Sequence, residues 1–293
     1  MIYLLLSILA STIIFVVFKL FSHYKINTLH AIVVNYFVAC ISGLIAYSGK
    51  IVVSEIPEYE WFYFTLGLGA LFIIVFNLMA ITTQKSGLSV VSVATKMSLI
   101  IPIIFGLAYY KESLGPFKIA GIILALTAVY LASIKAKDGI AIQPKNLIFP
   151  ALVFLGSGII DTSLKFLEDS YVAANAVPLF SSTIFSAAAV IGILVLCVQA
   201  IQGKFKFQFK NIIGGIVLGV PNYFSIYFLV KALRSDLLES SGVFTINNVA
   251  IVLLSTLIGI IAFKEKLILK NWIGIALAVV SIGCIFLAAV YDL

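Results

Sequence analysis

Ten long apolar runs, separated by short polar connections, constrain this chain more than any other feature. Each run has about twenty residues, the length that an α-helix needs to cross the hydrocarbon core of a bilayer. Of the 293 residues, 62% are hydrophobic and 11% are charged, so polar surface is too scarce to cover a water-soluble globule. This composition excludes a soluble enzyme, a disordered chain and a free nucleic-acid-binding protein. The net charge of +7 does not indicate nucleic-acid binding, because the lysines are scattered between the apolar runs and do not form one basic patch.

The runs predict transmembrane helices, because backbone amides cannot stay unpaired in lipid. An outer-membrane barrel would show alternating segments of about ten residues, and these are absent. The first run has no basic start and no small-residue cleavage site, so we expect it to be the first span. The predicted fold is an all-α, multi-pass bundle in the inner (cytoplasmic) membrane. Its ten spans are 2–21, 29–47, 61–82, 90–110, 117–134, 147–167, 173–199, 212–233, 243–263 and 272–291.

The chain divides into two similar halves at its longest polar stretch, residues 135–146. We therefore predict two five-helix repeats, residues 1–138 and 139–293. Because five is odd, the second repeat enters the membrane inverted relative to the first. Inverted repeats are typical of secondary transporters, in which the substrate site lies at the repeat interface. The matches are Glu112 with Glu265 and Gly121 with Gly274 at an offset of 153, Gly67 with Gly219 at 152, and Ser11 with Ser157 and Lys19 with Lys165 at 146.

A paired motif stands at the ends of the fourth and ninth spans. Its copies are Tyr110-Lys111-Glu112-Ser113-Leu114 and Phe263-Lys264-Glu265-Lys266-Leu267, followed by Gly121 and Gly274 respectively. With this motif the chain resembles, over essentially its whole length, the EamA-type members of the drug/metabolite transporter superfamily. Pro102 in the fourth span fits the family pattern, and its counterpart Ser255 departs from it.

The resemblance implies ten helices and the transport of small metabolites, often as efflux. It also implies a central cavity lined by helices one to four and six to nine, with helices five and ten as peripheral supports. It implies no particular substrate.

Lys96 is the most informative polar residue inside a predicted span. It lies about six residues into the fourth span, and a charge near the centre of a membrane helix costs roughly 2.5–3.5 kcal/mol. We therefore expect Lys96 to face the bundle interior or a wet cavity and to attract an anionic group of the substrate. The alternative is that its long stem reaches the nearer membrane interface.

Asp161 is the second charge inside a span. Ser157, Asp161 and Lys165 recur at spacings of four, which favours a local pair between Asp161 and Lys165. The alternatives are a pair with Lys96, or a carboxylate that carries protons and couples transport to a proton gradient.

The remaining candidate substrate-binding residues are polar and lie on corresponding spans of the two halves. Each of them is equally suited to a hydrogen bond between helices. They are Asn77, Asn222, Tyr223, Thr245, Asn247 and Asn248.

Several other residues have predicted structural roles. Glu112 and Glu265 precede the fifth and tenth spans, where a carboxylate meets the partial positive charge of a helix start. Gly215 and Gly219 have the spacing of a close helix contact. The sequence predicts no metal site and no cofactor, because its cysteines are isolated within apolar runs. These are Cys40, Cys197 and Cys284.

The orientation in the membrane stays open at this point. Twelve lysines fall in the connections on one side and six lysines or arginines on the other, which favours termini outside the cell. The family resemblance implies cytoplasmic termini instead.

We interpret the chain as a secondary active transporter that exports a small polar or amphipathic metabolite, such as an amino acid, by alternating access. Its expected partners are this small molecule, the lipid bilayer and protons as a candidate coupling ion, with no nucleic acid. An exchanger or flippase for a lipid-linked or phosphorylated substrate is the alternative, and it would need more interior cations. An intramembrane enzyme is disfavoured, because neither HExxH nor GxSxG occurs.

Overall fold

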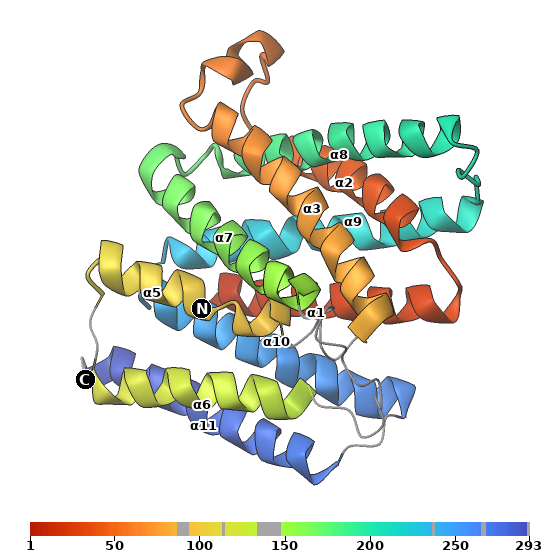
Figure 1. Ribbon diagram of the computed structural model, residues 1–293. Helices are drawn as coiled ribbons and strands as arrows, with labels where there is room; N and C mark the ends of the chain where they lie inside the picture. Colours follow the sequence, from red (N-terminus) through yellow and green to blue (C-terminus); the bar gives the residue numbers. More distant parts are fainter. Residues whose placement is uncertain (87–93, 113–114, 134–147, 236–237, 265–267, 292–293) are drawn as a thin grey trace.

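A computed structural model of the protein describes residues 1–86, 94–112, 115–133, 148–235, 238–264 and 268–291. These residues form helices joined by turns, and no strand occurs among them (Figure 1). The elements are α1 (Ile2–His23), α2 (Thr28–Ala46), the short 3-10 helix η1 (Val53–Glu58), α3 (Phe62–Ser86), α5 (Ile100–Tyr109), α6 (Pro116–Ser133), α7 (Ile148–Tyr171), α8 (Val177–Ile201), α9 (Phe209–Leu233), α10 (Ser240–Phe263) and α11 (Leu269–Tyr291).

The predicted ten-helix membrane bundle is confirmed. Eight of the described helices are long and apolar enough to cross a bilayer, and two shorter apolar helices, Ala94–Tyr109 and Pro116–Ala132, stand at the predicted fourth and fifth spans. Apart from the fourth span, the predicted ends lie within four residues of the observed ends. The predicted repeat boundary, between residues 138 and 139, lies outside the described residues.

The fourth span differs from the continuous helix that the sequence predicts. A helical turn at residues 94–97 is followed by a turn at Ser98 and Leu99, and α5 begins only at Ile100. Pro102 explains this break, because it has no N–H to donate to the carbonyl of Ser98. The amide of Ile101 donates to that carbonyl instead, at 2.9 Å, in the tighter i→i−3 pattern. Lys96 therefore lies immediately before an interruption in a membrane helix.

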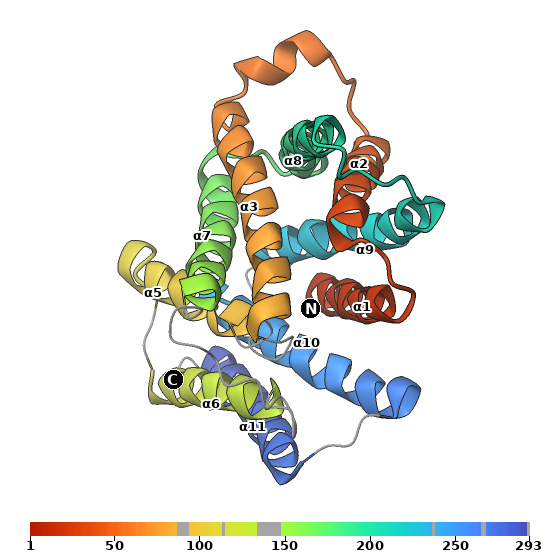
Figure 2. The same ribbon diagram turned by 45° about the vertical axis from the view of Figure 1, so that its right-hand side comes forward.

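The helices of the two halves interleave (Figures 1 and 2). If α1, α2, α3, α5 and α6 correspond to α7, α8, α9, α10 and α11, several of the main contacts have a counterpart in the other half. The contact α2–α9 maps onto α3–α8, α1–α9 onto α3–α7, and α1–α10 onto α5–α7, while α2–α8 and α6–α11 map onto themselves. The contact α6–α10 departs from this pattern, because its counterpart α5–α11 is not among the main contacts of the described helices. This pattern is compatible with the predicted duplication. The pair α6 and α11, the fifth and tenth helices, lies at one edge of the bundle (Figure 2).

Two glycines let α9 approach α2 closely, as their spacing predicts. A Cβ atom added at Gly219 would lie 2.5 Å from the Cβ atom of Val38 and 2.8 Å from the carbonyl oxygen of Asn35. One added at Gly215 would lie 2.6 Å from the carbonyl oxygen of Ala31. These distances are too short for a carbon atom, so this contact requires glycine.

We expect Gly219→Ala to destabilise the protein by about 1–3 kcal/mol, because the added methyl group forces α2 and α9 apart. Gly67→Ala is the matched control, because no atom lies within 4 Å of the added Cβ there. The control should leave the protein unchanged or stabilise it by up to about 1 kcal/mol. Thermal unfolding in detergent measures both variants, and equal stability of the two would contradict the assigned contact.

Candidate substrate site

Lys96 is buried inside the bundle and does not reach an interface. Only 7% of it is exposed. Its ammonium group donates a hydrogen bond of 3.0 Å to Oδ1 of Asn248 in α10. The same nitrogen lies 5.0 Å from the ring centre of Phe15 in α1, a favourable cation–π contact. The structure thus places Lys96 in the interior, as the first of the two sequence interpretations predicts.

Asp161, in α7, provides the negative charge that acts on Lys96. The expected local pair between Asp161 and Lys165 is wrong. The ammonium nitrogen of Lys165 lies 3.5 Å from the carboxylate of Asp169 and 3.7 Å from that of Glu168. These carboxylates stand three and four residues after Lys165 on the same helix face, so Lys165 is directed toward the end of α7 and away from Asp161.

The four residues of this site come from four helices, two from each half. An offset of 146, which superposes Ser11 on Ser157, also superposes Phe15 on Asp161. At the offset of 153 that matches the paired motif, Asn248 corresponds to Thr95 and Lys96 corresponds to Val249. The charged and polar groups of the site therefore do not repeat between the halves. The sequence interpretation missed Phe15, although its correspondence with Asp161 under the repeat offset was available as a signal.

The ammonium group of Lys96 has unused hydrogen-bonding capacity within the described residues. An ammonium group has three N–H donors, and Lys96 donates one hydrogen bond within the described part of the chain, to an uncharged amide. One hydrogen bond to a neutral amide does not replace the water that this cation loses on burial. A ligand with an anionic group would complete the environment of Lys96, and a cationic group would be attracted to Asp161.

Three of the predicted site residues form hydrogen bonds that support the helices. The side-chain amide of Asn77 donates to the carbonyl of Ile73 at 2.7 Å, within α3. The hydroxyl of Thr245 donates to the carbonyl of Ser241 at 2.7 Å, within α10. Asn222 donates to Oδ1 of Asn35 at 3.1 Å and so joins α9 to α2.

Two further predicted residues carry a buried polar atom without a hydrogen-bond partner in the described structure. These atoms are Oδ1 of Asn247 and the hydroxyl of Tyr223. Asn247 adjoins Asn248 on α10, whereas Tyr223 packs in a hydrophobic core with Tyr36 of α2 and Phe180 of α8. Buried polar atoms are rarely left unpaired, so Oδ1 of Asn247 has the capacity to accept a hydrogen bond, whereas Tyr223 belongs to a different part of the bundle.

Both copies of the paired motif end their helices with the same backbone turn. Lys111 after α5 and Lys264 after α10 have φ angles of 53° and 51°, in the left-handed region that favours glycine. After the first turn, the carboxylate of Glu112 accepts hydrogen bonds from the hydroxyl of Ser240 and, at 3.2 Å, from the amide of Ser241.

Glu112 thus meets a helix start, as predicted, but the helix is α10 and not the expected α6. Burial acts to raise the pKa of Glu112, yet the hydrogen bonds from Ser240 and Ser241 and the charge of Lys118 outweigh it, and the pKa lies below its ordinary value. The carboxylate is therefore ionised at neutral pH. Its negative charge compensates the partial positive charge at the start of α10. Glu265 lies outside the described residues.

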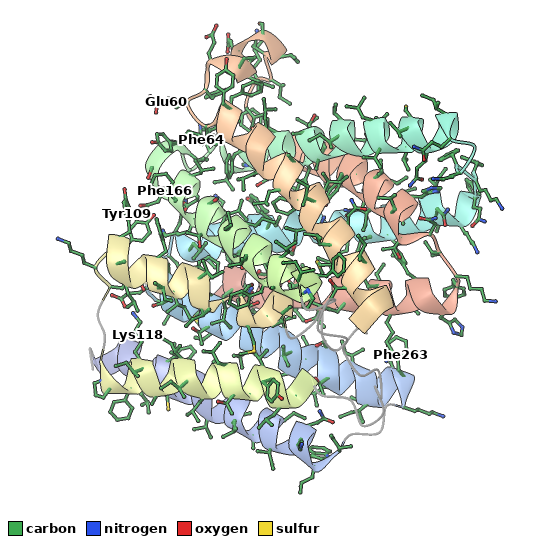
Figure 3. All side chains as sticks on the ribbon, viewed as in Figure 1. Glu60, Phe64, Tyr109, Lys118, Phe166 and Phe263 are labelled. Carbon is green, nitrogen blue, oxygen red and sulfur yellow. The ribbon has the colours of Figure 1, made fainter. Side chains whose placement is uncertain are left out.

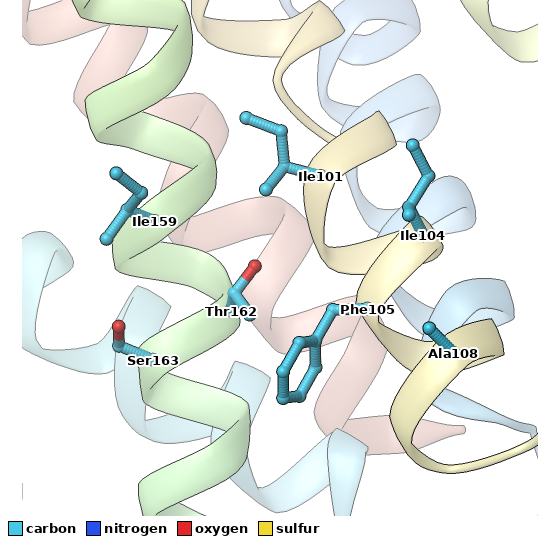
Figure 4. A pocket seen from close by; sticks show the side chains of 7 residues that line it. All are labelled: Ile101, Ile104, Phe105, Ala108, Ile159, Thr162 and Ser163. Atoms are coloured by element: carbon cyan, nitrogen blue, oxygen red, sulfur yellow. The ribbon is translucent and has the colours of Figure 1, made fainter.

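A hollow of about 350 Å³ lies between α5 and α7 (Figure 4). Its walls are apolar apart from the hydroxyl groups of Thr162 and Ser163, and that of Thr162 donates to the carbonyl of Gly158 at 2.8 Å. The described residues that line it include none of the four that meet around Lys96, so the hollow is separate from the polar site. The lining residues are Ile101, Ile104, Phe105, Ala108, Ile159, Thr162 and Ser163.

Comparisons with known proteins agree with the fold. The sequence pattern of the EamA-like transporter family matches residues 1–134. A protein of Haemophilus influenzae, described as an uncharacterized protein, is 31% identical over 288 residues, which cover 97% of each chain. A crystal structure with 14% sequence identity superposes with a TM-score of 0.73, covering 97% of this chain and 98% of its own, and it supports the fold alone. The chain belongs to the EamA-like transporter family, in the drug/metabolite transporter superfamily, and is a multi-pass membrane protein.

The contact between Lys96 and Asn248 predicts a measurable energetic coupling. Asn248→Leu removes the acceptor of a buried ammonium and should destabilise the protein by about 1–3 kcal/mol. In a Lys96→Met background the same substitution should cost at least about 1 kcal/mol less, because no buried cation is left unpaired. Denaturation of the four proteins in detergent gives the coupling, and additive effects would show that the two side chains do not interact.

Proposed function

We propose that the protein is a secondary active transporter that exports a small polar or amphipathic metabolite, such as an amino acid, by alternating access. One observation carries this proposal: in the bundle interior Lys96 contacts Asn248 and Phe15 and is attracted by the charge of Asp161, so that helices of both halves contribute. Structural proteins gain little from a buried cation held by a neutral amide, because its removal from water costs more than the contact returns. A charge retained in this position therefore favours a role in binding.

The arrangement suits a substrate with both an anionic and a cationic group. The free N–H donors of Lys96 match a carboxylate, and Asp161 matches an amine. Phe15 offers an apolar surface beside them. A lipid-linked or phosphorylated substrate fits less well, because Lys96 is the single cation among the described residues that meet at this point.

Inverted repeats, residues 1–138 and 139–293, would give this site access to each face in turn. The helix contacts that have a counterpart in the other half and the shared left-handed turn at Lys111 and Lys264 support this division. Two such halves have equivalent states in which one face is open and the other is closed. We place the protein in the inner (cytoplasmic) membrane, with protons as the coupling ion and Asp161 as the group that carries them.

Transport by reconstituted protein tests the proposal. Uptake of a panel of labelled metabolites into proteoliposomes should show accumulation of at least one zwitterionic compound, and Lys96→Ala should lower it at least tenfold. Lys204→Ala is the matched control, because Lys204 is exposed and its ammonium contacts only Gln202 in the described structure. Full activity of Lys96→Ala would remove this residue from the site.

Asp161→Asn tests the coupling role in the same assay. If Asp161 carries the proton, this variant should lose its response to a pH gradient and should exchange labelled for unlabelled substrate only at higher substrate concentration, because the partner of the substrate amine is also lost. Gradient-driven uptake equal to that of the wild type would contradict the role proposed for Asp161.

A further inference from the structure

Two cation–π contacts join the halves of the bundle. In one, the ammonium nitrogen of Lys19 in α1 lies 4.0 Å from the ring centre of Phe263 at the end of α10. In the other, the ammonium nitrogen of Lys165 in α7 lies 5.3 Å from the ring centre of Tyr110, directly after α5. Each contact pairs a lysine of one half with an aromatic residue of the other.

The two contacts are equivalent under the repeat. Lys19 superposes on Lys165 at the offset of 146, and Tyr110 superposes on Phe263 at the offset of 153. The aromatic residue is in both cases the first residue of the paired motif, which gives this motif a role that its glutamates alone do not explain. Two independent offsets thus select the same two contacts.

The contacts lie at opposite ends of the bundle. We call the end where α1 and α10 finish the Phe263 face and the end where α5 and α7 finish the Tyr110 face. Figure 3 labels Phe263 at one end and Tyr109, the neighbour of Tyr110, at the other. Because both contacts cross from one half to the other, each holds the halves together at one face.

The two contacts differ in the distance between the ammonium nitrogen and the ring centre. On the Tyr110 face, Lys165 also pairs with Glu168 and Asp169, and Glu112 accepts from the start of α10 beside it. On the Phe263 face the lysine lies closer to its ring, at 4.0 Å. The shorter separation gives the stronger cation–π attraction.

We propose that these equivalent contacts are the two gates of the transporter, Lys19–Phe263 closing the Phe263 face and Lys165–Tyr110 closing the Tyr110 face. This inference rests on the alternating access proposed above. A lysine–aromatic contact suits a gate, because the ammonium becomes hydrated when the face opens and the cost of breaking the contact is small. Loss of one gate then shifts the population of the two states without unfolding the protein.

Thiol accessibility tests this directly and needs no knowledge of the substrate. The reporter is Ser157→Cys, which lies in α7 one turn before Asp161 and is 8% exposed. It is placed in a chain whose three native cysteines are replaced by alanine, and reconstituted in a known orientation. A membrane-impermeant maleimide added to one side at a time reports how often each face is open.

Lys19→Met should raise the labelling rate from the Phe263 face and lower it from the Tyr110 face, and Lys165→Met should do the reverse. We expect about two- to fivefold changes, the size of a partly exposed cation–π contact. Lys19→Arg should behave like the wild type, since arginine also contacts aromatic rings. Lys204→Met is the control for the loss of a lysine, because the exposed Lys204 contacts Gln202 in the described structure and belongs to neither of the two contacts.

Changes in the same direction for both lysine variants, or no change in properly folded protein, would overturn the inference. Phe263→Leu and Tyr110→Leu remove the same contacts from the aromatic side and must reproduce the opposite shifts. If transport depends on Lys96 while these variants leave accessibility unchanged, the gates are wrong and the proposed function stands. If accessibility responds but no metabolite is transported, the proposed function is wrong and the conformational exchange stands.

Discussion

The buried ammonium of Lys96 is the constraint on which the rest of the account depends. A charge inside the bilayer must be compensated by the protein or by a ligand. Here the compensation comes from a neutral amide, an aromatic ring and a carboxylate that the side chain does not contact directly. The helix break after Met97 adds to this, because interrupted membrane helices expose backbone groups beside the sites that they form.

The helix scaffold is similar in the two halves, whereas the residues of the central site are not, and these two features have different roles. Several of the helix contacts, the left-handed turns at Lys111 and Lys264, and the two lysine–aromatic contacts recur in both halves. If each face opens in turn, these shared features must undergo equivalent movements in the two halves. The central residues do not recur, since Phe15 stands where the other half has Asp161. A duplicated scaffold can thus keep equivalent motions while its centre becomes selective for one kind of cargo.

Much of the fold could be predicted from the sequence, because apolar runs in lipid permit little besides helices. The close contact at Gly219 followed from residue spacing alone. The break at Ser98 did not, although Pro102 was recognised, because its position depends on which amide replaces the missing donor. The partners of Lys165 and the helix met by Glu112 were also mispredicted. Both depend on which side chains tertiary packing brings together, and spacing along one helix does not contain that information.

Alternating access requires the two halves to move against each other around Lys96. Electron–electron distance measurements on pairs of spin labels test this movement. One pair is at His23 and Ala262, near the Phe263 face, and the other is at Tyr109 and Tyr171, near the Tyr110 face. All four positions are exposed. If the halves move in this way, each pair of labels should show two distances, and one pair should lengthen as the other shortens when conditions change the balance of states. A single unchanging distance for both pairs, or changes in the same sense, would contradict it.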